Sequence, residues 1–236
     1  MKAFVTGIGW VSAAGPGRGR AKGAFAMPAG VLPEISRKEV FAAPDRRFGR
    51  LDPFSRLGLA AIAFALRDAG LEEWDSKRPF GLLAESACGC LATDGAYFDT
   101  VLEEGGSLAS PHLFAYTLPN TFLGEAAIRF GLSGGGLVLS GAGPRGSEAL
   151  TMALENLEWG DEKGVLAGIC DLEAPPPLEA PEGAAPGALF VVLEREPAGG
   201  LAPLGELSIA EGLALDGCPV ADLPSLVRAC HKNSRG

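Results

Sequence analysis

The chain is short of the residues on which many catalytic and metal sites depend. It has only two histidines, His112 and His231, and five cysteines among 236 residues. Cys88 and Cys90 are separated by a single residue, and this spacing builds no four-ligand zinc site with so few histidines. An odd number of cysteines in a chain of this size indicates reduced thiols. We therefore expect no metal site and no disulfide framework.

Long apolar runs and an overall positive charge are also missing. No uninterrupted apolar stretch reaches the ~18 residues of a membrane helix, and the first residues follow a strand pattern rather than that of a signal peptide. The formal net charge of -9 argues against nucleic acid as the main partner. We therefore expect a cytoplasmic protein that binds neither nucleic acid nor membranes.

The positive charge that is present lies near the N-terminus. Residues 1–60 carry ten basic and four acidic side chains, a balance of +6 within a chain whose net charge is -9. Such an asymmetry indicates either a docking surface for an acidic partner or an ordinary solvated basic face.

Strand-like and helical patterns alternate along most of the chain. Buried strands are predicted at residues 2–9, 79–86, 136–140, 163–171, 188–196 and 202–212. Helices are predicted at residues 52–71, 93–105, 118–132 and 146–160, with one more short helix and a polar tail in the last twenty residues. The alternation predicts an α/β fold with a mainly parallel mixed sheet and helices on both of its faces.

A glycine-rich turn joins the strand at 136–140 to the helix at 146–160. Gly141, Gly143 and Gly146 have the spacing of a dinucleotide-binding turn. However, Pro144 removes a backbone N–H, and the acidic Asp171 comes late for a ribose contact. A nucleotide-binding oxidoreductase therefore stays a minor alternative.

Several segments together resemble the β-ketoacyl-acyl-carrier-protein synthases, which have a thiolase-like fold. The similar segments are "VTGIGWVSAAGPG", "RRFGRLDPFSRLGLAAIAFALRDAGL", "SPHLFAYTLPNTFLGEAAIRFGLSGG" and "GLVLSGAGPRGSEALTMALENLEWGDEKGVLAGICD", and they occur in the family's order. The resemblance covers about residues 2–212. It implies a thiolase-like half at 1–212, equivalent to the family's N-terminal domain, followed by a short helix and tail at 213–236.

Two departures from the family's pattern affect the expected activity. Gly143 stands where the family has its nucleophilic cysteine, and glycine has no side chain to form a thioester. The family's catalytic histidines belong to a second half that has no counterpart in this sequence. The resemblance therefore implies a subunit similar to the chain-length factors, without independent activity or a cofactor, in type II fatty acid, polyketide or aryl-polyene biosynthesis.

The resemblance also implies roles for particular residues. The acyl-tunnel wall and partner interface are expected at Leu113, Phe114, Tyr116, Val138 and Ser140. Docking of the acyl carrier protein is expected at Arg46, Arg47 and Arg50, which match the family's basic turn. Arg145, which follows the missing nucleophile, would fill the emptied pocket or pair with an acidic group of the partner.

The expected partner is a full-length ketosynthase subunit in a heterodimer. The main alternative is a homodimeric module that binds acyl groups or an acyl carrier protein by itself. An enzyme with altered chemistry, such as malonyl decarboxylation, is disfavoured because the groups that would hold an enolate are missing.

Overall fold

A computed structural model describes residues 1–21, 23–43, 45–140, 145–179, 185–198 and 200–233. Its strands are β1 (Lys2–Ser12), β2 (Gly15–Arg18), β3 (Phe80–Glu85), β4 (Gly136–Leu139), β5 (Gly164–Asp171), β6 (Gly187–Glu194), β7 (Gly205–Ile209), β8 (Leu213–Leu215) and β9 (Cys218–Pro219). Its helices are α1 (Arg37–Val40), α2 (Pro53–Asp68), α3 (Leu91–Leu102), α4 (Pro111–Phe114), α5 (Thr121–Phe130), α6 (Ser147–Trp159) and α7 (Leu223–Asn233), with 3-10 turns η1 (Phe48–Arg50) and η2 (Glu103–Gly106).

These strands form one mixed sheet in the order β4-β3-β5-β6-β1-β7-β8-β9, with β2 paired to β1. The α/β class with a mixed sheet is confirmed. The parallel part is smaller than the sequence indicates, because only β4, β3 and β5 are parallel neighbours. From β5 onward each pair is antiparallel, as β6 pairs with β5 on one side and β1 on the other.

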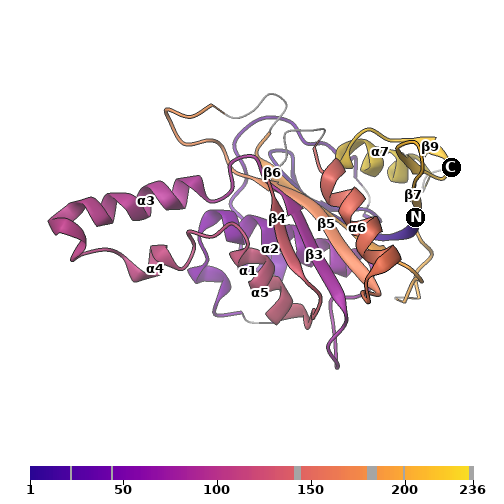
Figure 1. The fold of residues 1–236 in the computed structure, drawn as a ribbon, viewed down its shortest axis with the longest axis horizontal. Helices are drawn as coiled ribbons and strands as arrows, with labels where there is room; N and C mark the ends of the chain where they lie inside the picture. Colours follow the sequence, from indigo (N-terminus) through magenta and orange to yellow (C-terminus); the bar gives the residue numbers. More distant parts are fainter. Residues whose placement is uncertain (22, 44, 141–144, 180–184, 199, 234–236) are drawn as a thin grey trace.

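Helices cover both faces of the sheet, as predicted (Figure 1). One apolar core lies between the sheet and helices α1, α2 and α5, with Phe54 and Phe122 among its fully buried side chains. A second core lies on the other face, where Leu150 of α6 and Leu226 of α7 pack against the strands. Both faces of the central strands are therefore buried, which explains the continuous apolar sequence of β5 and β6.

Helix α2 is the most buried helix, and its start follows from local sequence. Asp52 is the N-cap and accepts a hydrogen bond from the backbone N–H of Ser55 at 3.0 Å, while Pro53 occupies the first helical turn. The helix lies very close to β1, because a Cβ added at Gly9 would come within 2.2 Å of the Ala65 nitrogen. Glycine in β1 thus permits the helix–sheet contact that forms the first core.

Strand β4 differs from its predicted environment. The sequence predicts a buried strand, but Gly136 and Leu137 are exposed, and Leu137 has 45% of its surface accessible. The reason is its place in the sheet, since β4 pairs with β3 on one side and with no other described strand on the other. An apolar edge strand of this kind is a template for pairing with another chain.

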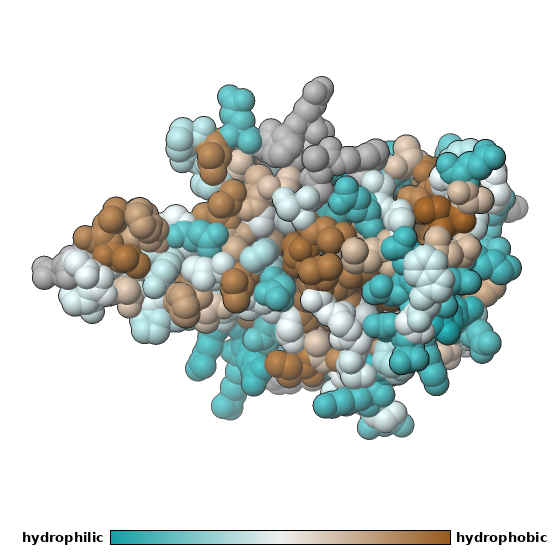
Figure 2. All heavy atoms as spheres, viewed as in Figure 1, coloured by the Kyte–Doolittle hydropathy of each residue, from teal (hydrophilic) through white to brown (hydrophobic). Residues whose placement is uncertain are grey.

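Helices α3 and α4 form an arm that extends away from the sheet (Figure 1). In α3 only Thr93 is buried. Large apolar side chains on the arm are exposed instead, including Phe98, Leu102 and Leu108, and Figure 2 shows apolar atoms gathered at its outer part. A short helix gains little stability without packing, so this arm presents an apolar surface that its own chain leaves open.

Candidate functional site

Strand β3, strand β5 and the start of helix α6 meet at the position where the sequence places the nucleophile elbow. The carboxyl ends of β3 and β5 lie at the same edge because the strands are parallel, with Glu85 opposite Ile169. Glu85 ends β3 and Asp171 ends β5, and both side chains are buried. Buried carboxylates need hydrogen bonds or ion pairs, so their partners indicate what this site does.

Glu85 occupies the N-terminus of α6. Its Oε2 accepts a hydrogen bond from the Gly146 nitrogen at 2.8 Å, and its Oε1 accepts one from the Ala149 nitrogen at 2.7 Å. A carboxylate is stabilised there by the partial positive charge of the helix end. The same N–H groups would be needed to hold a pyrophosphate, so this contact counts against the dinucleotide alternative.

The backbone at Gly146 requires glycine for two reasons. Its φ of 80° is in the left-handed region, and an added Cβ would lie 2.6 Å from the Cβ of Leu223 on α7. Gly146 is therefore explained by packing and backbone geometry. Gly141 and Gly143, including the predicted replacement of the nucleophile at Gly143, lie outside the described residues.

Asp171 joins three segments of the chain. Its Oδ1 accepts hydrogen bonds from the Ser86 hydroxyl at 2.9 Å and from the nitrogens of Ala87 at 2.7 Å and Cys88 at 3.0 Å. Its Oδ2 lies 3.5 Å from Nη2 of Arg145. Asp171 therefore holds the turn after β3 in place rather than a ribose.

Arg145 is paired within its own chain. Its Nη2 donates a hydrogen bond to the Ala185 carbonyl at 2.9 Å in addition to the ion pair with Asp171. The guanidinium is partly buried, with 19% of its side chain exposed. Asp171 therefore supplies an acidic partner for Arg145 within its own chain. The expectation that Arg145 fills the emptied pocket or pairs with an acidic group of the partner stays a prediction.

The thiols near this site are poor nucleophiles. Burial, and then the carboxylate of Asp94, raises the pKa of Cys90 to about 12, and burial followed by Asp171 raises the pKa of Cys88. The thiol of Cys170, on β5, is fully buried and its pKa is raised well above 9.0. A thiolate is the reactive form of cysteine, so the raised pKa values disfavour each of these three thiols as a nucleophile.

We expect one fast-reacting thiol in the folded protein. Cys218 is exposed on β9, whereas Cys230 is buried and its pKa is raised to about 12, mainly by burial. A shift of the pKa from 9.0 to about 12 lowers the thiolate fraction near pH 8 roughly a thousandfold. Titration with an aromatic disulfide reagent should therefore show one rapid phase in the native protein. Cys218→Ser should remove that phase, and a rapid phase that survives would contradict the assignment.

The two histidines are held on different elements. The ring of His112, on α4, lies 5.5 Å from the ring of Tyr116. The ring of His231, on α7, lies 5.6 Å from the ring of Trp10 on β1. The structure therefore places the two imidazoles in separate environments, one on the arm and one in the second core.

The residues expected at the tunnel wall divide into two groups. Phe114 is exposed on α4, where its ring lies 5.4 Å from that of Tyr97 on α3. Leu113 is half-buried on the same short helix. Tyr116 and Val138 instead pack against the first apolar core, and Ser140 is exposed just beyond β4. The tunnel-wall assignment of these residues stays a prediction.

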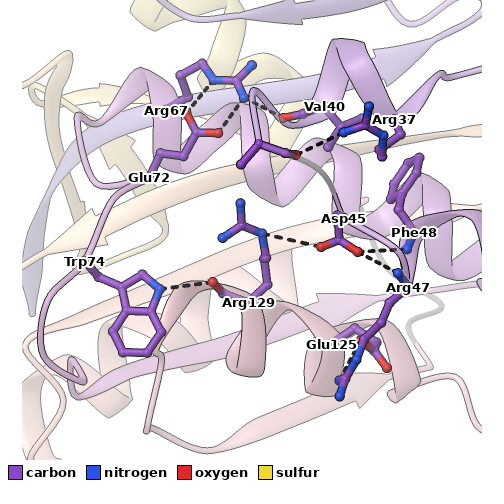
Figure 3. Close-up of polar contacts among 11 residues, drawn as sticks. Arg37, Val40, Asp45, Arg47, Phe48, Arg67, Glu72, Trp74, Glu125 and Arg129 are labelled. Atoms are coloured by element: carbon purple, nitrogen blue, oxygen red, sulfur yellow. Dashed lines mark hydrogen bonds and ion pairs between the residues drawn. The ribbon is translucent and has the colours of Figure 1, made fainter.

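The basic turn expected to meet the carrier protein is tied to α5 (Figure 3). Asp45 Oδ1 accepts hydrogen bonds from the nitrogens of Arg47 at 2.8 Å and Phe48 at 3.0 Å, which fixes the start of η1. Its Oδ2 lies 3.5 Å from Nε of Arg129, and Arg47 Nη1 lies 3.7 Å from Oε2 of Glu125. Both Arg129 and Glu125 belong to α5.

The basic turn also lies close enough to the segment after α4 for its charge to affect a pKa in that segment. Burial raises the pKa of Tyr116, the carboxylates of Glu125 and Asp52 raise it further, and Arg50 lowers it. The side chains of Arg46 and Arg50 are exposed, and neither side chain makes a hydrogen bond or an ion pair with another residue that the structure describes. Arg50, which is expected to dock the carrier protein, thus lies near Tyr116, which is expected at the tunnel wall, and both roles stay predictions.

Residues 20–177 match the family model described as "Beta-ketoacyl synthase, N-terminal domain". This chain belongs to that family. The β-ketoacyl synthase domain found here is 30% identical over 159 residues to 3-oxoacyl-[acyl-carrier-protein] synthase 2 of Vibrio harveyi, and 27% identical over 158 residues to the enzyme of that name from Vibrio cholerae. The matches span 66% of this chain but only 38% of each relative.

Solved structures share the fold of this β-ketoacyl synthase domain. A type II polyketide acyl-carrier protein in complex with its ketosynthase bound to the hexaketide has a chain that matches with a TM-score of 0.70 and 19% identity, over 88% of this chain and 68% of that one. A chain from the complex of the ketosynthase ApeO with its chain length factor ApeC from Xenorhabdus doucetiae matches with a TM-score of 0.61 and 17% identity. That match covers 100% of this chain and 92% of the other.

The described residues contain neither a membrane-spanning helix nor a cluster of metal ligands. None of the helices in those residues is both long enough and apolar enough to cross a membrane. No group of three or more His, Cys, Asp or Glu side chains in the same residues is arranged to hold a metal ion.

Proposed function

We propose that this β-ketoacyl synthase domain is a non-catalytic subunit, similar to a chain-length factor, that pairs with an active ketosynthase. Its pathway would be a type II synthesis of fatty acids, polyketides or aryl polyenes, in which an acyl carrier protein delivers the growing chain. The subunit would form part of the wall of the partner's acyl tunnel and would limit chain growth through the bulk of its side chains.

The observation that carries the proposal is the use of the α6 N-terminus by Glu85. A nucleophilic thiolate at a helix N-terminus is stabilised by free N–H groups and by the helix dipole. Here the nitrogens of Gly146 and Ala149 already donate to a buried carboxylate of the same chain. A second negative charge at this place would be opposed by Glu85, which supports a role without covalent catalysis.

The length of one solved relative supports the same proposal. The matched chain of the ApeO–ApeC complex is covered to 92% by this chain, so the two have nearly the same length. That complex joins a ketosynthase to its chain length factor. A short chain of this fold therefore occurs in an assembly of the proposed kind.

The exposed surfaces supply a place for the partner. Strand β4 leaves one apolar edge open, and the arm carries Phe98, Leu102 and Phe114 in exposed positions. Apolar surface of this extent is covered in stable assemblies. A partner that adds a strand beside β4 and receives the arm would bury both features at once.

The proposal is tested by identifying the native assembly. A tagged copy would be purified from the native host, and proteins that co-elute in stoichiometric amount would be identified by intact mass. The pair would then be rebuilt from purified recombinant subunits. A full-length synthase that carries both cysteine and histidines would support the proposal. A stable homodimer with bound acyl material would contradict it and favour the acyl-binding module.

Leu113→Trp is expected to shorten the product of the reconstituted pair. The larger side chain on α4 would reduce the space at the proposed tunnel wall, while turnover of short intermediates would change little. Liquid chromatography with mass spectrometry of the released products would measure this shift. Leu201→Trp, in the loop before β7, is the control, because it makes the same substitution at an exposed leucine outside the arm. If the wild type and both variants gave products of equal length, Leu113 would not be part of the tunnel wall.

A further inference from the structure

The basic turn and helix α5 enclose a shallow hollow of about 290 Å³ on the surface of the protein. Arg46, Arg47 and Arg129 line it, together with the apolar side chains of Leu59 and Ile128. Ile128 is strongly exposed, with 64% of its surface accessible. Positive charge around an apolar hollow suits an acidic amphipathic helix, which would pair its carboxylates and insert one apolar side chain.

Two carboxylates lie among these arginines, and they have different environments. Asp45 is part of the framework, since it caps η1 through two backbone N–H groups and holds Arg129 of α5. Arg129 is further fixed by Phe41, whose ring centroid lies 4.9 Å below the guanidinium. Arg129 and Asp45 therefore shape the hollow and are not free to change partners.

Glu125 makes a looser contact. Its Oε2 lies 3.7 Å from Nη1 of Arg47, a long distance for an ion pair, and 66% of the Arg47 side chain is exposed (Figure 3). The Glu125 side chain is itself 24% exposed, so water reaches both groups, and an ion pair this long and this open contributes little to stability. Arg47 can leave Glu125 for another carboxylate at little cost to the fold.

We propose that Glu125 competes for Arg47 with the acidic partner that docks at this surface. On docking, Arg47 would exchange Glu125 for a carboxylate of the partner. The inference rests on the proposed function in taking that partner to be the acidic helix of an acyl carrier protein. Arg46 and Arg50 provide the first attraction, and Glu125 sets how long the complex lasts. Weak, reversible docking is what a carrier needs if it must leave after each transfer.

The direct test is Glu125→Gln, which keeps the size of the side chain and removes its charge. Binding of a purified type II acyl carrier protein would be measured by isothermal titration calorimetry at several salt concentrations. We expect Glu125→Gln to bind about 2- to 5-fold more tightly than the wild type at low salt. The difference should shrink as salt rises, because screening weakens contacts between exposed charges.

A matched control removes the same charge elsewhere. Glu158 is an exposed carboxylate of α6, on the opposite face of the sheet, so Glu158→Gln should leave the affinity within experimental error of the wild type. Arg47→Gln should weaken binding, and in that background Glu125→Gln should lose most of its effect. Full additivity of the two substitutions would overturn the proposal, since it would show that Glu125 acts through net charge alone and not through Arg47.

A second probe separates this inference from the proposed function. A poly-L-glutamate peptide carries the acidic charge without the fold of a carrier protein. Glu125→Gln could bind the peptide more tightly than the wild type while neither of these two proteins binds the carrier protein. That result would support competition by Glu125 for Arg47 and would contradict an acyl carrier protein as the partner. If Glu125→Gln bound the carrier protein as tightly as the wild type or less tightly, competition by Glu125 would be wrong, while the proposed function would not be affected.

Discussion

Glu85→Gln is expected to lower the free energy of unfolding by about 2–4 kcal/mol. The buried carboxylate accepts hydrogen bonds from the nitrogens of Gly146 and Ala149, which are 61 and 64 residues away in sequence. A glutamine keeps the size but presents an NH₂ group to one of these donors and loses the interaction with the helix dipole. In a chain of this size, such a loss corresponds to a fall in Tm of roughly 4–16 °C, which calorimetry would measure.

Glu148→Gln is the matched control for this substitution. Glu148 lies in the first turn of the same helix and is exposed. Its removal takes away the same charge near the same helix end without breaking a buried hydrogen bond, so the expected loss is about 0.3–1 kcal/mol. If the two variants had equal stability, Glu85 would contribute only charge, and the argument for an occupied helix N-terminus would fail.

Val138→Pro is expected to weaken the proposed pairing with a ketosynthase at least about 100-fold, or about 2.7 kcal/mol. The Leu82 nitrogen donates to the Gly135 carbonyl and the Ser86 nitrogen donates to the Leu139 carbonyl, so the odd-numbered residues of β4 face β3. Because backbone groups alternate along a strand, those of Val138 face the open edge. Proline removes this outward N–H and places its ring where a partner strand would lie, while the bonds to β3 remain.

The control for the edge prediction is Val138→Ala. Val138 also packs against the first core, so alanine reports the loss of that packing while keeping the backbone N–H. Sedimentation of the reconstituted pair should show association close to that of the wild type for alanine and free subunits for proline. Circular dichroism would establish that both variants are folded. Unchanged association of a folded Val138→Pro protein would show that the partner does not pair with β4.

Elements with strong local signals could be predicted from the sequence. Helix α2 begins at Pro53, directly after its N-cap Asp52, as expected, because capping and the first-turn proline act within a few residues of the helix start. Strands β3 and β5 lie within their predicted ranges, since each is a short apolar run followed by a change in composition. The family resemblance rests on the order of such segments, and the family is confirmed.

The candidate site could be predicted only in part. The sequence pattern indicates Asp171 only as a late ribose contact, and it assigns no role to Glu85 or Glu125. The signal for Glu85 is an acidic residue at the end of an otherwise apolar strand, which requires a buried partner. That partner is a helix end more than sixty residues away, so no local pattern identifies it.

The sequence by itself determined the β-ketoacyl synthase fold, the start of α2 and the scarcity of catalytic side chains, because these depend on residue type and short-range spacing. Only the tertiary structure decided which apolar segments are buried. The segment at β4 and the segment at β5 are both apolar, yet β5 lies between β3 and β6 whereas β4 lies at the edge. Burial depends on neighbours brought together from distant parts of the chain, and composition alone does not specify them.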